Sequence, residues 1–243
     1  MGAVDQLIDA SRRLCDDLIQ RSDDLLADQG KVAWIYHPLE YARAPHEAYL
    51  TRFGGLGART LMIGMNPGHG MGNTGVPFGC PEQVRDRLGI TGLDVGAPAT
   101  THPRRQIQGL ACPKPEVSGR RIWSMLGEIH GDVDTIHAHL FIVNHCPMWM
   151  FDEEGRNITP DKVSGGVMRS LLERCDAHLV EVSRILDIER LVAVGAYAEQ
   201  RIRRIPAFTS MQIDRIPHPS PASPLANRNG GADWRALVRS VLT

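Results

Sequence analysis

Four short segments of the chain have the pattern of buried β-strands, and longer stretches with helical periodicity separate them. The four predicted strands are residues 61–65, 140–143, 190–194 and 212–216. Short runs dominated by apolar residues are typical of strands that are covered on both faces. Strands that alternate with helices predict a parallel sheet with helices on both of its faces, and therefore an α/β fold.

Between these strands, apolar residues recur at spacings of three and four, which is typical of amphipathic helices. The N-terminal segment has this spacing and ends at Gly30; we interpret it as a packing element. Ser118 is a suitable N-cap for the helix that follows it. Residues 89–108 are rich in Thr, Pro and Gly and predict a loop. The predicted helices are residues 4–26, 45–53, 81–88, 119–130, 167–185, 196–204 and 233–242.

The chain has 243 residues, of which 42% are hydrophobic, enough to bury one sizeable core. No linker or repeat divides it, so we predict a single domain over residues 1–243, with the N-terminal helix of residues 1–30 packed on it. There is no apolar run of membrane-spanning length and no secretory signal pattern. We expect an intracellular protein, in the bacterial cytoplasm (nucleoid) or, in a eukaryote, in the nucleus.

The five cysteines are scattered, and no pair has the close spacing of a zinc or iron–sulfur site. We therefore expect reduced thiols. His137, His139 and His145 lie close together in the sequence, but no carboxylate or thiol completes a ligand set. We expect no metal and no cofactor.

The net charge of −1 is unevenly distributed. Residues 1–30 hold seven Asp and three Arg, a charge of −4, so the remaining residues sum to +3. Arginines cluster at residues 104–105, 120–121 and 201–204. A modest basic face permits phosphate contacts without strong non-specific binding. Composition alone neither establishes nor excludes a nucleic-acid partner.

The first predicted strand ends abruptly at Asn66, and a glycine-rich loop follows. Five glycines lie between residues 68 and 79, so the backbone there can approach a ligand closely. The aromatic Phe78 stands alone between a proline and a glycine. The carboxyl edge of a parallel sheet is where ligands bind. The pattern favours a site for a flat molecule, with Met65 and Gly68 among the residues that contact it.

Three polar residues follow three different predicted strands: Asn66, Asn144 and His218. Because the strands are parallel, these side chains should meet at one edge of the sheet. Each has an ordinary structural explanation, as a turn residue, an Asx cap and a loop histidine. Their joint placement favours a functional site.

The stretch IGMNPGHGMGNTGVPFG, residues 63–79, and the stretch HPSPASPLANR, residues 218–228, together resemble the single-strand-selective monofunctional (SMUG-type) branch of the uracil-DNA glycosylase superfamily. Residues 36–50, 109–123 and 141–147 are also similar, in family order. The resemblance covers roughly residues 34–235. It implies a three-layer sandwich around a short four-stranded parallel sheet, in agreement with the strand count.

The resemblance implies a base-excision repair enzyme that flips uracil out of single- or double-stranded DNA, with 5-hydroxymethyluracil as a further candidate substrate. Hydrolysis of the N-glycosidic bond would leave an abasic site. Neither motif contains a lysine, so we expect no lyase step. A monomer that acts on DNA without a membrane partner is the family expectation.

The implied roles in catalysis follow the two motifs. Asn66 would position the attacking water, and the ring N–H of His218 would stabilise the departing base as a neutral donor. Phe78 would stack on the base. The amide of Asn144 would match the N3–H donor and O4 acceptor of uracil, whereas cytosine presents the opposite pattern.

Residues 219–228 would form a rigid wedge that enters the duplex, with Leu225 as an apolar plug. Arg120 and Arg121 lie in the first turn of the helix after Ser118, where an anion is favoured. A stiff surface loop and plain surface charge are the respective alternatives. The predicted DNA-binding residues are Ser118, Arg120, Pro219, Ser220, Pro221, Ser223, Leu225, Asn227 and Arg228.

Two positions depart from the family pattern. His69 replaces a proline and an aromatic residue, which shortens the loop by one, and Ala222 replaces a basic residue. His69 is either a new ligand contact or an exposed spacer. The shortened loop leaves open the excision of other deaminated bases such as hypoxanthine or xanthine. A catalytically silent lesion-binding protein is a separate alternative, against which the intact Asn66 and His218 speak.

Overall fold

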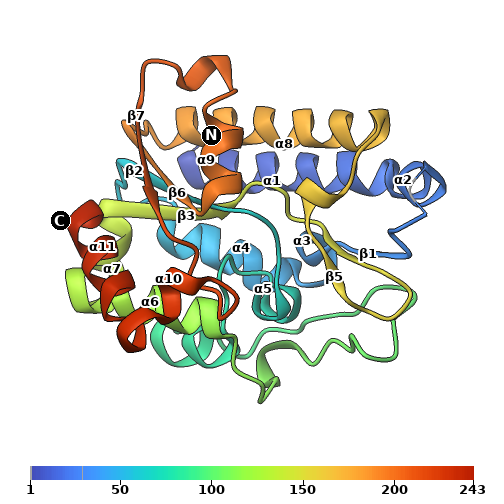
Figure 1. The fold of residues 1–243 in the computed structure, drawn as a ribbon, viewed down its shortest axis with the longest axis horizontal. Coiled ribbons are helices and arrows are strands. Elements are labelled where there is room, and N and C mark those ends of the chain that lie inside the picture. The colour runs from blue at the N-terminus through green and yellow to red at the C-terminus, as the bar shows by residue number, and fades with distance from the viewer. Residues whose placement is uncertain (1, 29) are drawn as a thin grey trace.

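The computed structural model describes residues 2–28 and 30–243, and a four-stranded parallel sheet lies at its centre (Figure 1). The strands run in the order β3-β2-β6-β7. They are β2 (Thr60–Gly64), β3 (Leu140–Asn144), β6 (Arg190–Val194) and β7 (Gln212–Ile216). All three pairings are parallel. The four predicted strands are confirmed, each within one residue at either end.

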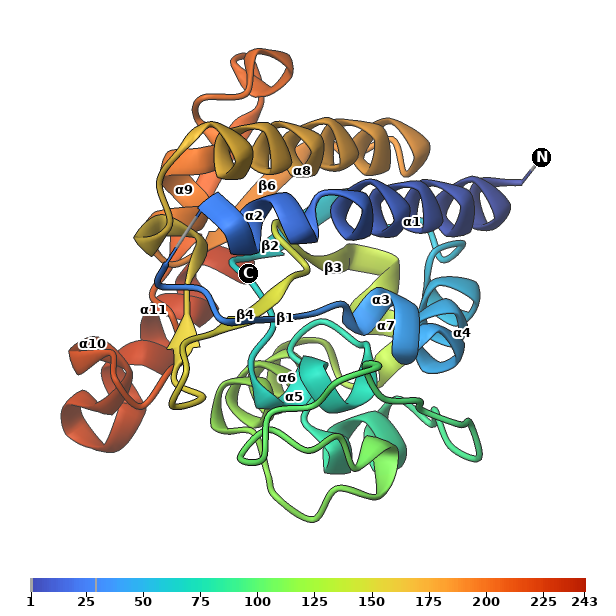
Figure 2. The ribbon, with the colours of Figure 1, turned by 90° about the vertical axis from the view of Figure 1, so that its right-hand side faces the viewer.

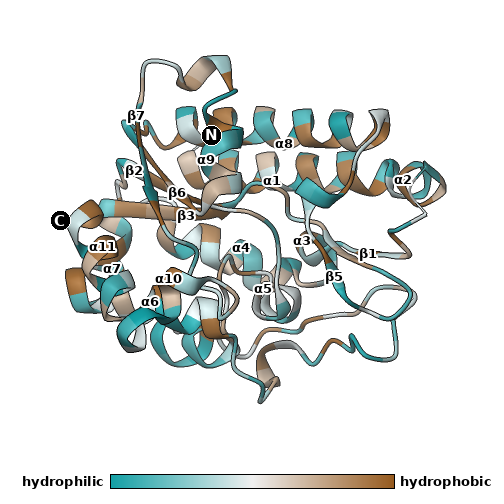
Figure 3. Ribbon diagram, in the orientation of Figure 1, coloured by the Kyte–Doolittle hydropathy of each residue, from teal (hydrophilic) through white to brown (hydrophobic). Residues whose placement is uncertain are grey.

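Helices cover both faces of this sheet, as Figures 1 and 2 show. On one face α1 (Ala3–Gln20) lies beside α8 (Gly166–Ile185), and on the other α6 (Val117–His130) contacts α11 (Ala232–Leu242). The remaining helices are α2 (Ser22–Asp28), α3 (Pro38–Tyr41), α4 (Arg43–Phe53), α5 (His69–Thr74), α7 (Val133–His139), α9 (Ala196–Ile202) and α10 (Pro224–Asn227). Strands β2, β3 and β6 are mostly apolar, the edge strand β7 is more polar, and the outer helices have polar and apolar faces (Figure 3). This is the predicted three-layer α/β arrangement.

At the outer edge of strand β3, the backbone groups of Ile142 bind a side chain rather than another strand. Tyr49 of α4 donates its O–H to the carbonyl of Ile142 over 3.1 Å and accepts the N–H of the same residue over 3.2 Å. A bare edge would expose unpaired backbone groups. The tyrosine satisfies both groups and ties α4 to the sheet.

The N-terminal segment forms two helices that break at Arg21, where a single helix over residues 4–26 was predicted. Leu7, Leu14 and Leu18 are buried. On the outer side, Arg12 pairs with Glu47 of α4 at 2.7 Å. The segment therefore packs on the rest of the fold.

The sequence did not predict a second, antiparallel sheet of order β1-β4-β5. Its strands are β1 (Trp34–Tyr36), β4 (Trp149–Phe151) and β5 (Asn157–Ile158). Strands of two or three residues are too short to show a periodic pattern. Tyr36, Trp149 and Phe151 pack edge to face in this sheet, with ring centroids 4.6–5.9 Å apart.

Two predicted segments have a different local structure. Residues 69–74, predicted as loop because of their glycines, form α5; Gly72 packs so closely on Trp149 that an added Cβ would lie 2.1 Å from the indole. Tertiary packing thus overrides the low helix propensity of glycine. Within the predicted helix 81–88, Gln83–Arg87 forms a π-helical turn. Single 3₁₀ turns complete the described elements, at Gly109–Ala111, Pro160–Lys162, Pro206–Phe208 and Arg228–Gly231.

Candidate active site

A cavity of about 330 Å³ opens at the carboxyl end of the parallel sheet, within the size range of ligand sites. Strand ends, the loop after β2, the start of α6, the β4–β5 hairpin and the loop after β7 all contribute to it. Its lining residues are Met65, Asn66, Pro67, Gly68, Met71, Phe78, Glu116, Ser118, Asn144, Asn157, Thr159, His218 and Ser220. All six residues predicted for catalysis or substrate binding are therefore brought together.

The floor of the cavity depends on a glycine. Gly64 ends β2, and a Cβ there would lie 2.2 Å from Oδ1 of Asn144 and 2.8 Å from the ring of Phe78. Asn144 and Phe78 are only 7% and 9% exposed. The two side chains therefore converge over a backbone that leaves room for nothing larger than hydrogen at residue 64.

The backbone of Phe78 is held in a conformation that residues other than glycine seldom adopt, with φ of +50°. Its carbonyl accepts the indole N–H of Trp123 over 3.0 Å and the N–H of Cys80 over 2.9 Å. A Cβ at Gly119 would lie 2.1 Å from the same carbonyl. Surrounding contacts thus fix a strained residue at the site, as is common where a ring must be positioned.

Asn144 is anchored through the residues that follow it. The N–H of His145 donates to the carbonyl of Gly64 over 3.0 Å, which extends the β2–β3 pairing. The His145 ring is fully buried and bonded to Tyr197 at 3.0 Å and Asp176 at 2.9 Å. Arg201 pairs with Asp176 at 2.6 Å. No local sequence pattern indicates this network, because its members come from three separate elements.

The amide of Asn144 has a replaceable partner. Its Nδ2 lies 3.0 Å from Sδ of Met71, a thioether and a weak acceptor. A ligand carbonyl would be a better acceptor for the same N–H. The Asn144 amide therefore has no strong internal hydrogen bond that a ligand would have to break.

Asn66 is half-buried at the start of the glycine-rich loop. Its Nδ2 donates to the carbonyl of Pro67 over 3.3 Å, and its Oδ1 has no hydrogen-bond partner among the described residues. This arrangement orients the amide and leaves an acceptor at the cavity wall. Such an acceptor can hold a water molecule.

The tautomer of His218 follows from its surroundings. The backbone N–H of Ser220 donates to Nδ1 over 3.1 Å, so in the neutral ring the proton lies on Nε2. Burial lowers the pKa of His218, which favours the neutral ring. Its ring centroid lies 6.4 Å from that of Phe78. The cavity thus contains a neutral N–H donor beside an aromatic ring.

The N-terminus of α6 contradicts the predicted cap. Glu116, not Ser118, is the N-cap; its carboxylate accepts the N–H of Ser118 over 3.1 Å and the N–H of Gly119. The helix amides that were expected to attract phosphate are therefore already used. Arg120 pairs with Glu82 at 2.6 Å.

Residues 219–228 form a loop that contains α10 and is tied to α6. Arg121 donates to the carbonyl of Pro219 over 2.7 Å and to Oδ1 of Asn227 over 3.0 Å. Leu225 is 41% exposed. Arg228 lies 3.8 Å from Asp233. Of the predicted DNA-binding residues, Ser118 and Ser220 line the cavity, while Pro221, Ser223 and Leu225 lie outside its lining.

His69 is neither a ligand contact in the cavity nor an exposed spacer, the two alternatives that the sequence left open. It is half-buried, absent from the cavity lining, and its Nε2 lies 3.3 Å from Sγ of Cys112. Burial lowers the pKa of His69, with smaller effects from Lys114 and Arg105 in the same direction. His69, the first residue of α5, therefore packs beside Cys112 and outside the lining of the cavity.

Among residues 2–28 and 30–243, no three His, Cys, Asp or Glu side chains form a group that could hold a metal ion. His137 stacks on Phe53, with ring centroids 3.9 Å apart, inside the core. In the same described ranges, no helix is both long and apolar enough to cross a membrane.

The fold and the cavity define a protein of the uracil-DNA glycosylase type, and comparison with known proteins shows the same. The profile of the Uracil DNA glycosylase superfamily matches residues 51–240, and the chain belongs to this superfamily. It is 41% identical over 214 residues to the single-strand selective monofunctional uracil DNA glycosylase of Bos taurus, covering 87% of this chain and 77% of the relative. The corresponding protein of Rattus norvegicus is 41% identical over 214 residues, covering 87% and 75%.

A solved structure shows the same fold. The crystal structure of wild-type SMUG2 from Pedobacter heparinus superposes with a TM-score of 0.60, over 94% of this chain and 95% of that chain, at 17% identity. The predicted fold class and family are confirmed.

Proposed function

We propose that the protein removes uracil from DNA by hydrolysing its N-glycosidic bond, and that it leaves an abasic site without cleaving the strand. The observation that carries the proposal is the convergence of Asn66, Phe78, Asn144 and His218 on one cavity. The names of its relatives support the same substrate. A base inside DNA must be flipped out to reach such a cavity.

Recognition of the base is assigned to the floor of the cavity. Phe78 stacks on the pyrimidine ring, and Asn144 donates to O4 of uracil and accepts its N3–H. Cytosine would leave both amide groups unpaired, which costs about 1–3 kcal/mol per buried group. Met65 and Gly68 complete the wall against the base.

His218 stabilises the departing base. Cleavage of the N-glycosidic bond places negative charge on the base and positive charge on the deoxyribose. The Nε2–H group, fixed by the Ser220 hydrogen bond to Nδ1, donates to uracil O2 as that charge develops. A neutral donor suffices, because a proton does not have to be transferred.

Asn66 holds the attacking water through its Oδ1. An amide cannot accept a proton at neutral pH, so it orients the water and does not act as a general base. The carboxylate of Glu116 lines the cavity but is bonded to two helix amides. We therefore assign a dissociative reaction in which water is captured after the base has begun to leave.

Contacts with DNA outside the cavity are assigned to the loop after β7 and the start of α6. Leu225 enters the space that the flipped nucleotide leaves, and Pro219, Pro221 and Asn227 keep that loop rigid. Ser118, Ser220 and Ser223 donate to phosphates, and Arg120 and Arg228 add charge. We propose a monomer, which size-exclusion chromatography with and without DNA tests, acting in the compartment that holds the genome.

Release of free base tests the function. Oligonucleotides with a single uracil, 5-hydroxymethyluracil, hypoxanthine or xanthine are incubated with the protein as single strands and as duplexes. We expect uracil to be released faster than the other bases. The product should be an abasic strand whose backbone is not cleaved. His69 makes no contact in the cavity that would favour the purines. Faster release of hypoxanthine or xanthine than of uracil would show that a deaminated purine, and not uracil, is the preferred substrate.

A further inference from the structure

The β4–β5 hairpin, which the sequence did not predict, forms one wall of the cavity mouth. In β5 and just beyond it, successive side chains alternate between the two faces of the strand. Ile158 packs into the core on one face. Asn157 and Thr159, on the other face, line the cavity. The hairpin thus turns two uncharged polar side chains toward the site.

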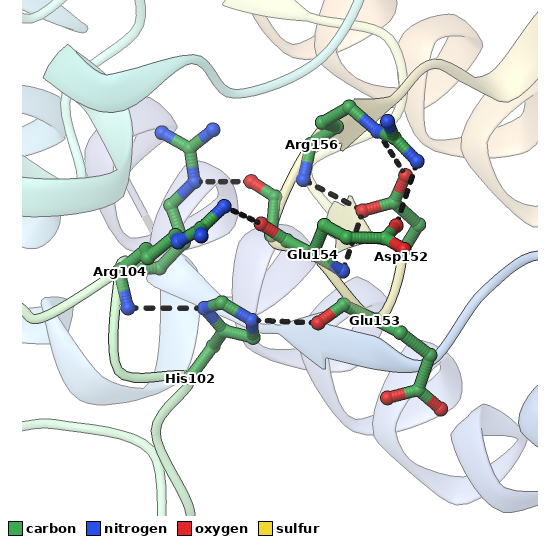
Figure 4. Close-up of polar contacts among 8 residues, drawn as sticks. His102, Arg104, Asp152, Glu153, Glu154 and Arg156 are labelled. Atoms are coloured by element: carbon green, nitrogen blue, oxygen red, sulfur yellow. Dashed lines mark hydrogen bonds and ion pairs between the residues drawn. The ribbon is translucent and has the colours of Figure 1, made fainter.

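The turn of this hairpin is held firmly by the loop of residues 102–105 (Figure 4). His102 accepts the N–H of Arg104 at Nδ1 over 3.1 Å, so its Nε2–H donates to the carbonyl of Glu153 over 3.0 Å. Arg104 donates to the carbonyl of Glu154 over 3.2 Å, and Arg105 donates to that of Gly155 over 2.6 Å. Arg104 and Arg105, one of the arginine clusters of the predicted basic face, therefore support the hairpin.

Close packing limits the movement of this turn. Gly155 has φ of +75°, and a Cβ there would lie 2.6 Å from the ring of His102. Asp152 also accepts the N–H groups of Glu154 and Arg156, over 3.0 and 2.8 Å. A two-residue strand is thus held at both its turn and its inner face, which pre-organises its outer face.

Neither outward side chain has a structural partner. The Asn157 amide and the Thr159 hydroxyl make no hydrogen bond with the described residues, although both line the cavity. Asn157 is exposed and Thr159 is half-buried, whereas Asn144 and Phe78 on the floor are buried. The hairpin side chains therefore lie at the rim, above the place assigned to the base.

We infer that Asn157 and Thr159 bind the sugar–phosphate backbone of the nucleotide whose base enters the cavity. This inference rests on the proposed function. A flipped nucleotide leaves its phosphates at the rim, and amide and hydroxyl groups are common donors to phosphate oxygens. Because both side chains are uncharged, they position the strand without adding to the salt-dependent, non-specific attraction.

Two measurements on the full-length protein test the inference. The first is kcat/KM for a uracil oligonucleotide; the second is Kd for an oligonucleotide with a tetrahydrofuran abasic-site analogue, which has the backbone but no base. The variant Asn157→Ala/Thr159→Val is expected to lose about tenfold or more in both, because hydrogen bonds to a charged group are lost. Glu153→Gln, on the same turn and outside the cavity lining, is the control and should match the wild type.

A double-mutant cycle tests the support of the hairpin. Arg105→Ala removes the hydrogen bond to Gly155 and is expected to reduce kcat/KM in the wild-type background. In the Asn157→Ala/Thr159→Val background it should cause no further loss, because it acts through those side chains. Thermal unfolding of each variant checks that the fold is retained.

The outcomes distinguish a contact with the DNA backbone from a contact with the base and from no contact with DNA. Equal losses in kcat/KM and in binding of the abasic analogue support a backbone contact. A loss confined to the uracil substrate would overturn it in favour of a base contact, and unchanged values in both would show an ordinary solvated edge strand. Failure of the wild type to release uracil would refute the proposed function, while binding of the analogue would still report on the hairpin.

Discussion

The backbone N–H of Ser220 donates to Nδ1 of His218 over 3.1 Å, which fixes the ring as the tautomer with its proton on Nε2. The bond is local, because the two residues are two positions apart. It exists only while Nδ1 is unprotonated. The same contact therefore orients the ring and selects its charge state.

The pH dependence of the reaction follows from this contact. Burial lowers the pKa of His218 below the usual value of about 6.5, so the neutral ring predominates above about pH 6.5. We expect that kcat/KM for uracil release does not decrease between about pH 6.5 and 8. A cationic histidine would instead lose activity as the pH rises through its pKa, and such a decline would contradict the neutral donor. His218→Gln, which keeps a neutral N–H, should retain more activity than His218→Ala.

Gly64→Ala should block the cavity without unfolding the protein. The added methyl would lie 2.2 Å from Oδ1 of Asn144 and would push the amide or Phe78 aside. The displaced amide would no longer match the base, a loss of about 1–3 kcal/mol in binding, so kcat/KM should fall about 10- to 100-fold. Gly166→Ala is the control, since its Cβ would meet nothing within 4 Å. Equal activity of Gly64→Ala and the wild type would mean that the base binds elsewhere.

Arg121 should matter more for duplex than for single-stranded substrate. It holds Pro219 and Asn227, and so supports the loop that is proposed to enter the duplex. Arg121→Ala is expected to lower kcat/KM on duplex DNA about tenfold, the value of hydrogen bonds to a charged group, and less on single strands. Arg203→Ala, which removes an exposed ion pair with Glu199, is the matched control. Equal losses on both substrates would assign Arg121 to general DNA binding.

His137, a buried histidine of the core, predicts how the stability of the fold depends on pH. Burial lowers the pKa of His137 to about 4, against about 6.5 in the unfolded chain. The unfolded chain therefore binds a proton first as the pH falls. Stability is fully present above about pH 6.5 and decreases toward pH 4, by up to about 3 kcal/mol for this one group.

His137→Phe should remove that dependence. Nε2 of His137 is buried without a partner, whereas its Nδ1–H donates to the carbonyl of Val133 over 2.8 Å, and the ring stacks on Phe53. Phenylalanine keeps the stack and removes both the unpaired atom and that hydrogen bond, two opposing effects, so we expect stability at pH 7 to change by about 1 kcal/mol or less. Urea unfolding at pH 7 and at pH 5 measures both effects. An unchanged pH slope would assign the titration to the other buried histidines.

The sequence was sufficient where a local pattern decides the structure. The buried strand at residues 190–194 is found with the predicted bounds, because a short apolar run that ends at a glycine is typical of a covered strand. Asn66, Asn144 and His218 could be placed at one sheet edge because parallel strands end on the same side. The structure brings them to one cavity, while their chemical roles remain proposals.

What could not be predicted depends on contacts between distant segments. α5 forms despite its glycines because Gly72 fits against Trp149 of the distant strand β4. The hairpin that carries Asn157 is shaped by hydrogen bonds from residues fifty positions earlier. No window of sequence contains such information.

Release of free uracil from a single-uracil oligonucleotide tests the central claim most directly, with Asn66→Ala and His218→Ala measured beside the wild type. We predict release by the wild type and a decrease of orders of magnitude in each variant, with all three proteins folded. Folded wild-type protein that releases no base, or variants that release uracil as fast as the wild type, would contradict the proposed catalytic site.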